Sequence, residues 1–187
     1  MNVDDTGATM IPLETDVKRI PVYKYKKLGR PSAGDEPDIV AYALVDDEDY
    51  ELQSQSRWFL SSENYVFRKM SVNKKQLWVS LHSEILQPTE GKMVDHINHD
   101  TLDNRRENLR PATPMENGRN KRPFAKSGVK GAYPQGRGWA SAIWMGTRKV
   151  YLGMFDTAEE AGARYDEEAR KLHGEFAYTN ADAREAQ

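Results

Sequence analysis

The 187-residue chain contains no cysteine. This absence excludes disulfide bonds, thiol chemistry and sulfur-ligated zinc, and it is usual for proteins of a reducing cytosol. Any metal ion must therefore be held by oxygen and nitrogen ligands. Long hydrophobic runs are absent too, since no segment approaches the roughly 18 apolar residues of a membrane-spanning helix. The first residues do not resemble a signal peptide, and we expect a cytoplasmic protein without a membrane partner.

Acidic residues are scarce in one part of the chain. Between residues 104 and 150 the only acids are Glu107 and Glu116, against eleven Lys and Arg. This segment therefore carries +9 and the remainder −11, although the net charge of the chain is −2. A basic segment within a nearly neutral protein is typical of a surface that binds a polyanion. A merely solvated face would mix both signs, so this alternative is the weaker one.

The first 75 residues contain short strand-like runs, and the composition of 38% hydrophobic and 30% charged residues indicates a soluble protein of one domain or two small ones. A short helix is expected after Asp46, with Leu52 and Trp58 facing inward. These elements predict a small α+β unit. The four acids at 46–49 could form a second metal site, but acids in the first turn of a helix more often complement its dipole.

The last 60 residues show a different pattern. Three short strands separated by Gly-rich turns precede a helix, for which Thr157 and Glu160 form an expected capping box and Gly174 an expected end. Along the middle strand, Ile143 shares one face with Trp139 and Ser141, and Trp144 shares the other with Ala140 and Ala142. We expect the small alanines to face the helix. The pattern predicts a separate β-β-β-α module.

The stretch "VDHINHDTLDNRRENLRPATPMENGRNKR", residues 94–122, combines residues able to bind metal with a group of arginines. Asp95 and His96 are adjacent at the end of a predicted strand, so one side chain can bind a metal ion while the other faces a water molecule. Asn117 follows on a short helix. Mg²⁺ prefers oxygen ligands and keeps waters for substrate phosphates, and a neutral imidazole can accept a proton from an attacking water. Asn104 and Asn108 could close the intervening loop through backbone hydrogen bonds.

This stretch resembles the HNH nuclease motif of phage-encoded homing endonucleases, over roughly 81–122. The resemblance implies a ββα-metal fold that cleaves DNA. It also implies that His96 is the general base, that Asp95 and Asn117 bind one divalent ion, Mg²⁺ or Mn²⁺, and that Asn108 is the central asparagine of the motif. Its "LDNRRENLR" portion is the most similar, and a phage or prophage origin is inferred from the resemblance.

The arginines of this motif are expected to hold phosphates near the reacting bond. The candidates are Arg105, Arg106, Arg110 and Arg119, followed by Lys121 and Arg122. Two positions depart from the family pattern. Many relatives have His-Arg where this chain has His82–Ser83, and they tend to have Gly at the position of His99. We interpret His82 as structural, although it could lie near the site. We interpret His99 as a bystander, and the alternatives are a phosphate contact or a second titratable group near the metal.

The segment "GVKGAYPQGRGWASAIWMGTRKVYLGMFDTAEEAGARYDEEARKLHGEFAYTN" resembles the APETALA-type ethylene-response-factor DNA-binding domain of plants, over 127–180. The resemblance implies a three-stranded antiparallel sheet that lies in the major groove of double-stranded DNA, with one helix packed behind it. The candidate DNA contacts are Lys130, Arg137, Trp139, Arg148 and Lys149. Hydrophobic packing is the alternative for Trp139.

Together these observations predict an α+β protein with a ββα-metal HNH nuclease core followed by a three-stranded antiparallel sheet packed on one helix. The expected segments are a flexible tail 1–18, an α+β lead-in 19–75, the nuclease core 76–122, a basic linker 123–127, the DNA-binding domain 128–180 and a tail 181–187. The predicted function is metal-dependent DNA cleavage, nicking or double-strand, by a monomer or homodimer. The alternatives are a non-catalytic DNA-binding regulator with a degenerate nuclease core and, more weakly, action on RNA.

Overall fold

A computed structural model describes residues 17–25, 38–121 and 128–185, which form two compact units, Met1–Pro111 and Ala112–Gln187. The described residues include no helix that is long and apolar enough to span a membrane. Arg122, the predicted linker 123–127 and nearly all of the predicted tail 1–18 lie outside the described residues. The predicted α+β class is confirmed. The division between the units falls inside the predicted core segment 76–122, because the helix that follows residue 112 packs with the C-terminal module.

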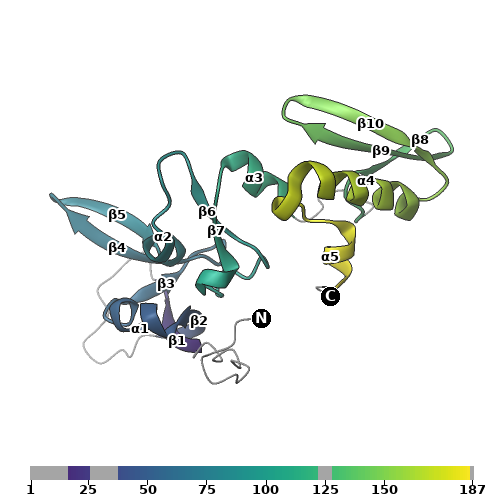
Figure 1. The fold of residues 1–187 in the computed structure, drawn as a ribbon. Helices are drawn as coiled ribbons and strands as arrows, with labels where there is room; N and C mark the ends of the chain where they lie inside the picture. Colours follow the sequence, from purple (N-terminus) through teal and green to yellow (C-terminus); the bar gives the residue numbers. More distant parts are fainter. Residues whose placement is uncertain (1–16, 26–37, 122–127, 186–187) are drawn as a thin grey trace, which may run out of the picture. The chain divides into compact units, whose positions relative to one another are not determined.

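A five-stranded sheet forms the frame of the first unit (Figure 1). Its strands are β1 (Val17–Lys24), β2 (Ile39–Asp46), β3 (Trp58–Leu60), β4 (Val66–Val72) and β5 (Lys75–Ser80), in the spatial order β2-β1-β3-β4-β5. All neighbouring strands are antiparallel except β1 and β3. The β4–β5 turn uses Asn73 and Lys74, both with positive φ, which suits a tight hairpin. As a result, β2 and β5 form the two edges of the sheet.

Two short helices, α1 (Asp47–Gln53) and α2 (Leu81–Leu86), accompany this sheet. The predicted inward position of Leu52 is wrong, since this residue is 63% exposed. The inward position of Trp58 is confirmed, but α1 ends at Gln53 and Trp58 begins β3. Trp58 is fully buried, and its indole N–H donates to the carbonyl of Gln53 at 2.8 Å. Burial of this large side chain organises the core where helix and strand meet.

The segment that resembles a nuclease motif folds onto the same core. It contains β6 (Met93–His96), the 3₁₀ turn η1 (Arg106–Asn108) and β7 (Leu109–Ala112), and the two strands form a small sheet of their own. Val94 and Leu109 are buried in one cluster with Ile20, Val45 and Trp58. The N-terminal strands and the motif therefore share a hydrophobic core rather than forming separate modules.

The loop between β6 and β7 covers the edge of β2. The N–H of Leu44 donates to the carbonyl of Leu102, and the N–H of Asn104 donates to the carbonyl of Leu44, both at 2.8 Å. An edge strand otherwise exposes unpaired backbone groups. By pairing with β2, the loop gains a fixed position on the sheet, and its side chains are held with it.

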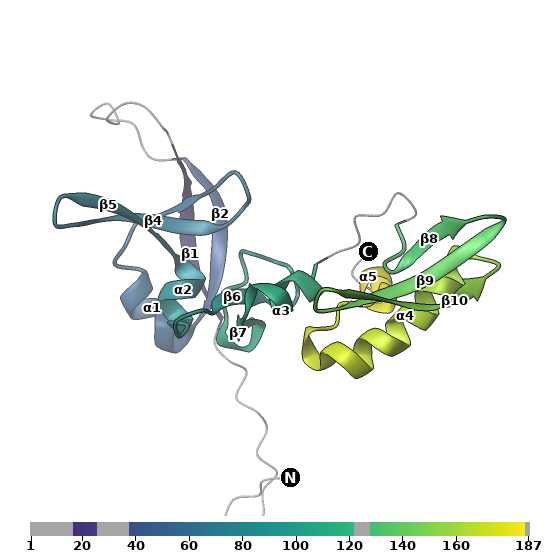
Figure 2. The ribbon, with the colours of Figure 1, turned by 90° about the horizontal axis from the view of Figure 1, so that it is seen from above.

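The second unit contains a three-stranded antiparallel sheet and a long helix. Its elements are α3 (Pro114–Arg119), β8 (Ala132–Gln135), β9 (Gly138–Met145), β10 (Arg148–Phe155), α4 (Ala158–His173), η2 (Gly174–Phe176) and α5 (Asn180–Glu185). The strand order is β10-β9-β8, and α4 packs along one face of the sheet (Figures 1 and 2). Thr157 and Glu160 form the predicted capping box, and Gly174 ends the helix with φ 53°.

The face of β9 that meets α4 is the opposite of the predicted one. Ile143 is 1% exposed and packs with Tyr165 and Ala169 of α4, so the odd-numbered face is turned to the helix. Trp144 is 58% exposed on the other face. Strand alternation therefore places Trp139 on the helix side, which favours the packing alternative for this residue over the predicted DNA contact.

Candidate active site

Three aromatic rings gather at the end of β6. His96 is 5% exposed, and the ring of His82, from α2, meets it edge to face with centroids 5.0 Å apart. Tyr65 lies against both, at 5.6 Å from His82 and 6.0 Å from His96. The rings restrict the rotation of the His96 imidazole, because a packed ring cannot turn without displacing its neighbours. The interpretation of His82 as structural therefore becomes more specific, since it contacts the predicted base directly.

The side chain of Asn104 determines which nitrogen of His96 carries the proton. Asn104 is fully buried, and its Nδ2 donates to the carbonyl of Thr101 at 3.2 Å. Its Oδ1 is then the atom that faces His96 Nε2, at 3.4 Å. Because an amide oxygen only accepts, Nε2 of neutral His96 must carry the hydrogen. The proton-accepting nitrogen of His96 is consequently Nδ1.

Burial keeps both histidines of this cluster neutral. It lowers the pKa of His96 from its ordinary value, while the bond from Asn104 and the charge of Asp95 oppose this shift. Burial together with the neighbouring His96 lowers the pKa of His82 from 6.5 to about 4. A neutral imidazole at pH 7 is the form that can accept a proton from water.

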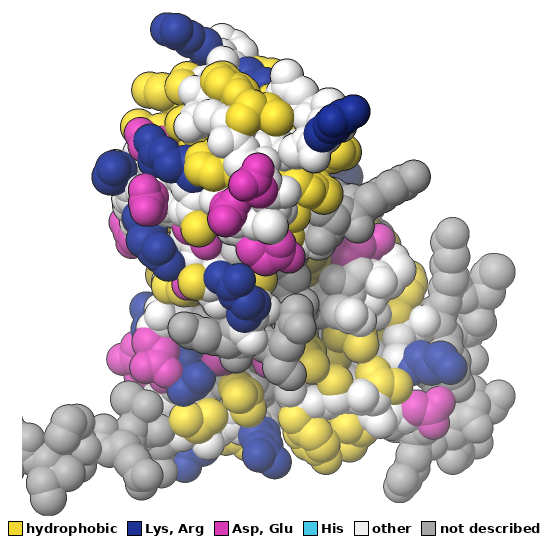
Figure 3. Space-filling model, turned by 90° about the vertical axis from the view of Figure 1, so that its right-hand side faces the viewer, with side chains coloured by type: hydrophobic (Ala, Val, Ile, Leu, Met, Phe, Trp, Pro, Cys, Tyr) yellow, Lys and Arg dark blue, Asp and Glu magenta, His cyan; other side chains and the backbone are white. Residues whose placement is uncertain are grey.

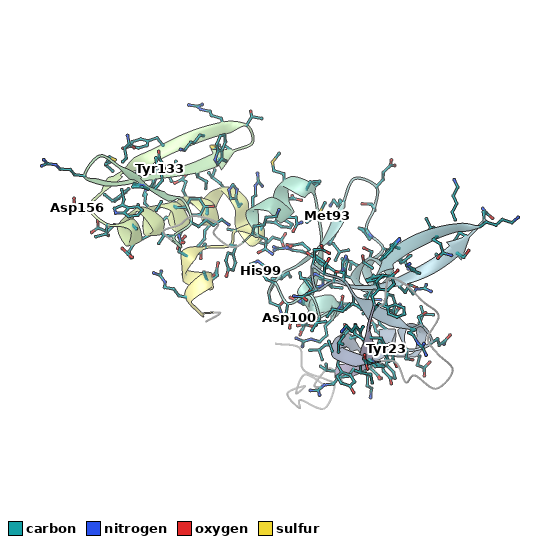
Figure 4. The ribbon with its side chains drawn as sticks, turned by 180° about the vertical axis from the view of Figure 1, so that it is seen from behind. Tyr23, Met93, His99, Asp100, Tyr133 and Asp156 are labelled. Carbon is teal, nitrogen blue, oxygen red and sulfur yellow. The ribbon has the colours of Figure 1, made fainter. Side chains whose placement is uncertain are left out.

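Asn108 closes the loop that follows β6. It is buried, its Oδ1 accepts from the N–H of Asn98 at 3.0 Å, and its Nδ2 donates to the carbonyl of Asp103 at 2.7 Å. The same loop contains His99, at φ 65°, shown with Asp100 in Figure 4. A left-handed backbone favours glycine, which agrees with the expectation from the resemblance that Gly is common at this position.

Asp95 is buried together with Arg110. The guanidinium donates through Nε and Nη2 to Asp95 Oδ2, at 2.9 and 2.8 Å, and both side chains are under 10% exposed. These bonds hold the Arg110 charge inside the protein and do not support the predicted phosphate contact. Carboxylates that bind metal are commonly oriented by such a second hydrogen bond.

Two further arginines of the motif are also paired with acids. Arg105 donates twice to Asp103 at 2.8 Å, and Arg106 donates twice to Asp49 at 2.8 Å. The N–H of Arg106 also donates to Asp46 Oδ2 at 2.7 Å. These bonds do not support the predicted phosphate contacts. Three of the acids at 46–49 thus have a role that the helix dipole does not explain, because Asp46, Glu48 and Asp49 bind Arg106 of the motif.

The other predicted metal ligand, Asn117, belongs to the second unit. It lies half-buried on α3, which starts with a complete capping box between Thr113 and Glu116. Among the described residues, no group of three or more His, Asp and Glu side chains is placed to hold a metal ion. Asp95 offers a carboxylate within the first unit, and Asn117 offers an amide within the second. Their oxygens fit Mg²⁺, which uses one or two protein ligands and takes the rest from water and phosphate.

Lys130, another predicted DNA contact, is occupied within the second unit. Its ammonium donates to the carbonyls of Arg119, Lys121 and Tyr178, at 2.6, 2.8 and 3.1 Å. Burial lowers its pKa to about 8, so it remains charged at pH 7. These bonds join α3 to the C-terminal module and do not support a phosphate contact.

The other predicted cationic DNA contacts of the second unit lie on its surface. Within the described part of the second unit, the ion pairs are those of Arg164 with Glu167 and Glu168. Arg137, Arg148 and Lys149 are exposed and take part in none of them. On the face drawn in Figure 3, Lys and Arg side chains stand apart among acidic and hydrophobic ones. The cations thus form no single continuous patch on that face.

Comparisons with known proteins decide the family. A family model described as HNH endonuclease matches residues 87–119. An uncharacterized HNH endonuclease of Acanthamoeba polyphaga mimivirus is 32% identical over 145 residues, which are 74% of this chain and 74% of that protein. The chain belongs to the HNH endonuclease family. No solved structure matches it.

Family membership makes this HNH endonuclease a DNA-cleaving hydrolase, and such enzymes generally use a divalent metal ion. The matched residues include Asp95, His96, Asn108 and Asn117. Two residues that surround His96 were not assigned to it from the sequence. The ring contact of His82 gave no signal in the pattern, and Asn104 was distinguishable from Asn108 only by its docking on β2.

Proposed function

We propose that this HNH endonuclease hydrolyses DNA phosphodiester bonds with His96 as the general base. The observation that supports this role is the buried, neutral imidazole whose Nε2 proton is directed to Asn104, so that Nδ1 is the basic nitrogen. Nδ1 accepts the proton of a water that attacks phosphorus in line with the leaving oxygen. Proton acceptance by a positioned side chain contributes roughly 10²–10⁴-fold to rate.

The proposed ligands of the divalent ion are Asp95 and Asn117. Arg110 orients the Asp95 carboxylate by its two bonds to Oδ2. When bound, Mg²⁺ or Mn²⁺ would supply charge stabilisation for the phosphate and the leaving oxygen. Asn108 serves as a positioning residue, because its two bonds set the loop that carries Asn104 toward His96. The residues present therefore fit the metal chemistry of the family.

The second unit is proposed to dock on double-stranded DNA. Support comes from the resemblance of its sequence to a DNA-binding module and from three exposed cations, Arg137, Arg148 and Lys149, which form no ion pair with the described residues. Arg119, Lys121 and Arg122 remain proposed phosphate contacts, the last of them outside the described residues. Such contacts supply affinity and position, without sequence information.

A plasmid-cleavage assay tests the proposal. Supercoiled DNA is incubated with Mg²⁺ and the wild-type chain, His96→Ala or His99→Gly, with and without EDTA. We expect nicked or linear DNA with the wild type and no cleavage in EDTA. The cleavage rate of His96→Ala should be at most about 1% of the wild-type rate. His99→Gly is the matched control: its backbone conformation suits glycine, and it should cleave normally.

Two outcomes of the cleavage assay would contradict the proposal. Full cleavage by His96→Ala would remove His96 from the base role. Intact DNA in every arm, with gel shifts that weaken as salt is added, would instead favour a DNA-binding regulator with a degenerate nuclease core.

A further inference from the structure

A cavity of about 550 Å³ opens in the second unit beside the start of β8. At this point β9 extends past its last residue paired with β8. Its walls come from the end of α3, the start of β8, the exposed end of β9 and the last turn of α4. The volume is within the range of sites that hold a small organic ligand, roughly 300–1,000 Å³. Neither the family relationship nor the proposed metal site accounts for it.

The charge of this cavity is one-sided. Its lining includes Arg119, Lys121, Lys130 and Lys149 and no Asp or Glu. Lys130 is engaged with three carbonyls, but the other three cations form no ion pair among the described residues of this unit. The charges of Asp166 and Asp182 act on Lys130, so the positive charge that attracts an anion into the hollow is that of Arg119, Lys121 and Lys149. The ligand is therefore expected to carry a phosphate or a comparable group.

Planar surfaces border the same cations. Lys149 Nζ lies 4.0 Å from the centroid of the Tyr133 ring, and Tyr133 is visible on the sheet in Figure 4. Trp144 pairs directly with Lys149 across the strands and is 58% exposed. Aromatic faces beside cations are the arrangement on which bases of single-stranded nucleic acids stack. His173, 8% exposed, also lines the cavity.

We propose that this cavity binds one unpaired nucleotide of the DNA substrate, with its base on Trp144 and its phosphate near Lys149 and Arg119. A base inside a duplex has both faces covered by its neighbours, so it reaches an aromatic wall only when it leaves the stack. Double-stranded DNA is too wide for a hollow of this size. The inference rests on the proposed docking of the second unit on DNA. It adds that the second unit prefers DNA with an unpaired nucleotide.

Fluorescence anisotropy of two labelled 20-base-pair duplexes tests the preference, using the full chain in EDTA so that nothing is cleaved. One duplex is perfectly paired and the other has a single extra, unpaired nucleotide at its centre. We expect the bulged duplex to bind at least about tenfold more tightly, as stacking of one base provides. Trp144→Ala should reduce this ratio to about one, and Trp144→Phe should restore most of it.

Tyr151→Ala is the matched control. Tyr151 is an aromatic residue of the same hairpin, 55% exposed, which does not line the cavity. Its substitution should leave the preference intact, and thermal melts of each variant exclude unfolding. Equal affinity of the wild type for both duplexes overturns the inference, as does a preference that survives Trp144→Ala. Displacement of the bulged duplex by free deoxynucleoside monophosphate at equal concentration would assign the cavity to a free nucleotide and overturn it too.

Failure of the broader proposal looks different. If the second unit does not dock on DNA, Arg148→Ala leaves the affinity for the paired duplex and its salt dependence unchanged. If only the cavity is misassigned, the paired duplex still binds, weakens with salt as phosphate contacts require, and shows no preference for the bulge.

Discussion

The edge of the His82 ring meets the His96 imidazole at an angle of 88°, with the centroids 5.0 Å apart. The two residues are contributed by different elements, α2 and β6, which both pack on the core of the first unit. His82 has no hydrogen-bond partner for its buried Nδ1 among the described residues. Its contribution to His96 is therefore shape and exclusion of water.

We expect His82→Ala to lower the cleavage rate about tenfold while DNA affinity stays within about twofold, because misplacement of a catalytic group reduces the rate. His82→Phe, which keeps a ring, should retain most of the rate. The pH–rate profile gives a second readout. Water entering the space left by the ring reduces the burial that lowers the His96 pKa, so the rising limb should move to higher pH in His82→Ala. A purely structural role would leave this midpoint unchanged.

The low pKa of His82 makes the first unit sensitive to acid. The unfolded chain takes up a proton at His82 near pH 6.5, whereas the folded unit does so only near 4. The contribution of neutral His82 to the free energy of unfolding is therefore fully present above pH 6.5. As the pH falls from 6.5 toward 4, the free energy of unfolding decreases by on the order of 3 kcal/mol. Urea unfolding at several pH values checks this. The difference between the wild type and His82→Phe should grow in this window, and a constant difference would contradict the assignment.

Replacing Asn104 should affect activity and stability together. Asn104→Ala removes the acceptor that fixes the His96 tautomer and the donor to Thr101, so we expect a loss of about 1–3 kcal/mol in the free energy of unfolding. The cleavage rate should fall roughly 10²-fold even well below the melting temperature. Asn73→Gly is the control, since Asn73 is exposed in the β4–β5 turn and its φ of 49° suits glycine. Normal cleavage by Asn104→Ala would refute the tautomer argument.

The limits of sequence reasoning are visible in these residues. The strands and helix of the C-terminal module could be predicted from turn residues and the capping box at Thr157, because those signals are local. The arginines could not be assigned, since a long cation reaches acids far away in sequence: Arg106 binds Asp49, 57 positions earlier. Alternation defined the two faces of β9 but not which one meets α4. That choice depends on the packing of Ile143 against Tyr165.

Arg106 and Asp49 should be coupled in stability. Asp49 is nearly buried, whereas the Arg106 side chain is 45% exposed, so solvent weakens the pair. We expect Arg106→Ala to reduce the free energy of unfolding of the first unit by about 1–2 kcal/mol. Asp49→Ala should cost a similar amount, and the double variant less than the sum. Additive losses in this double-mutant cycle, measured by urea unfolding, would contradict the coupling.

Arg106→Ala also serves as the control for a predicted DNA contact of the second unit, Arg148. A phosphate contact releases counterions, so removing one reduces the slope of log affinity against log salt by about one. Arg148 is exposed on the β9–β10 hairpin and forms no ion pair within the part of the chain that the structure describes. Arg148→Ala should show this reduction, measured by anisotropy with perfectly paired DNA in EDTA. Arg106→Ala should leave the slope unchanged, because its guanidinium is bound to Asp49. If the two variants behaved the other way round, DNA would be held by the motif of the first unit, and the cations of the hairpin would have no part in docking.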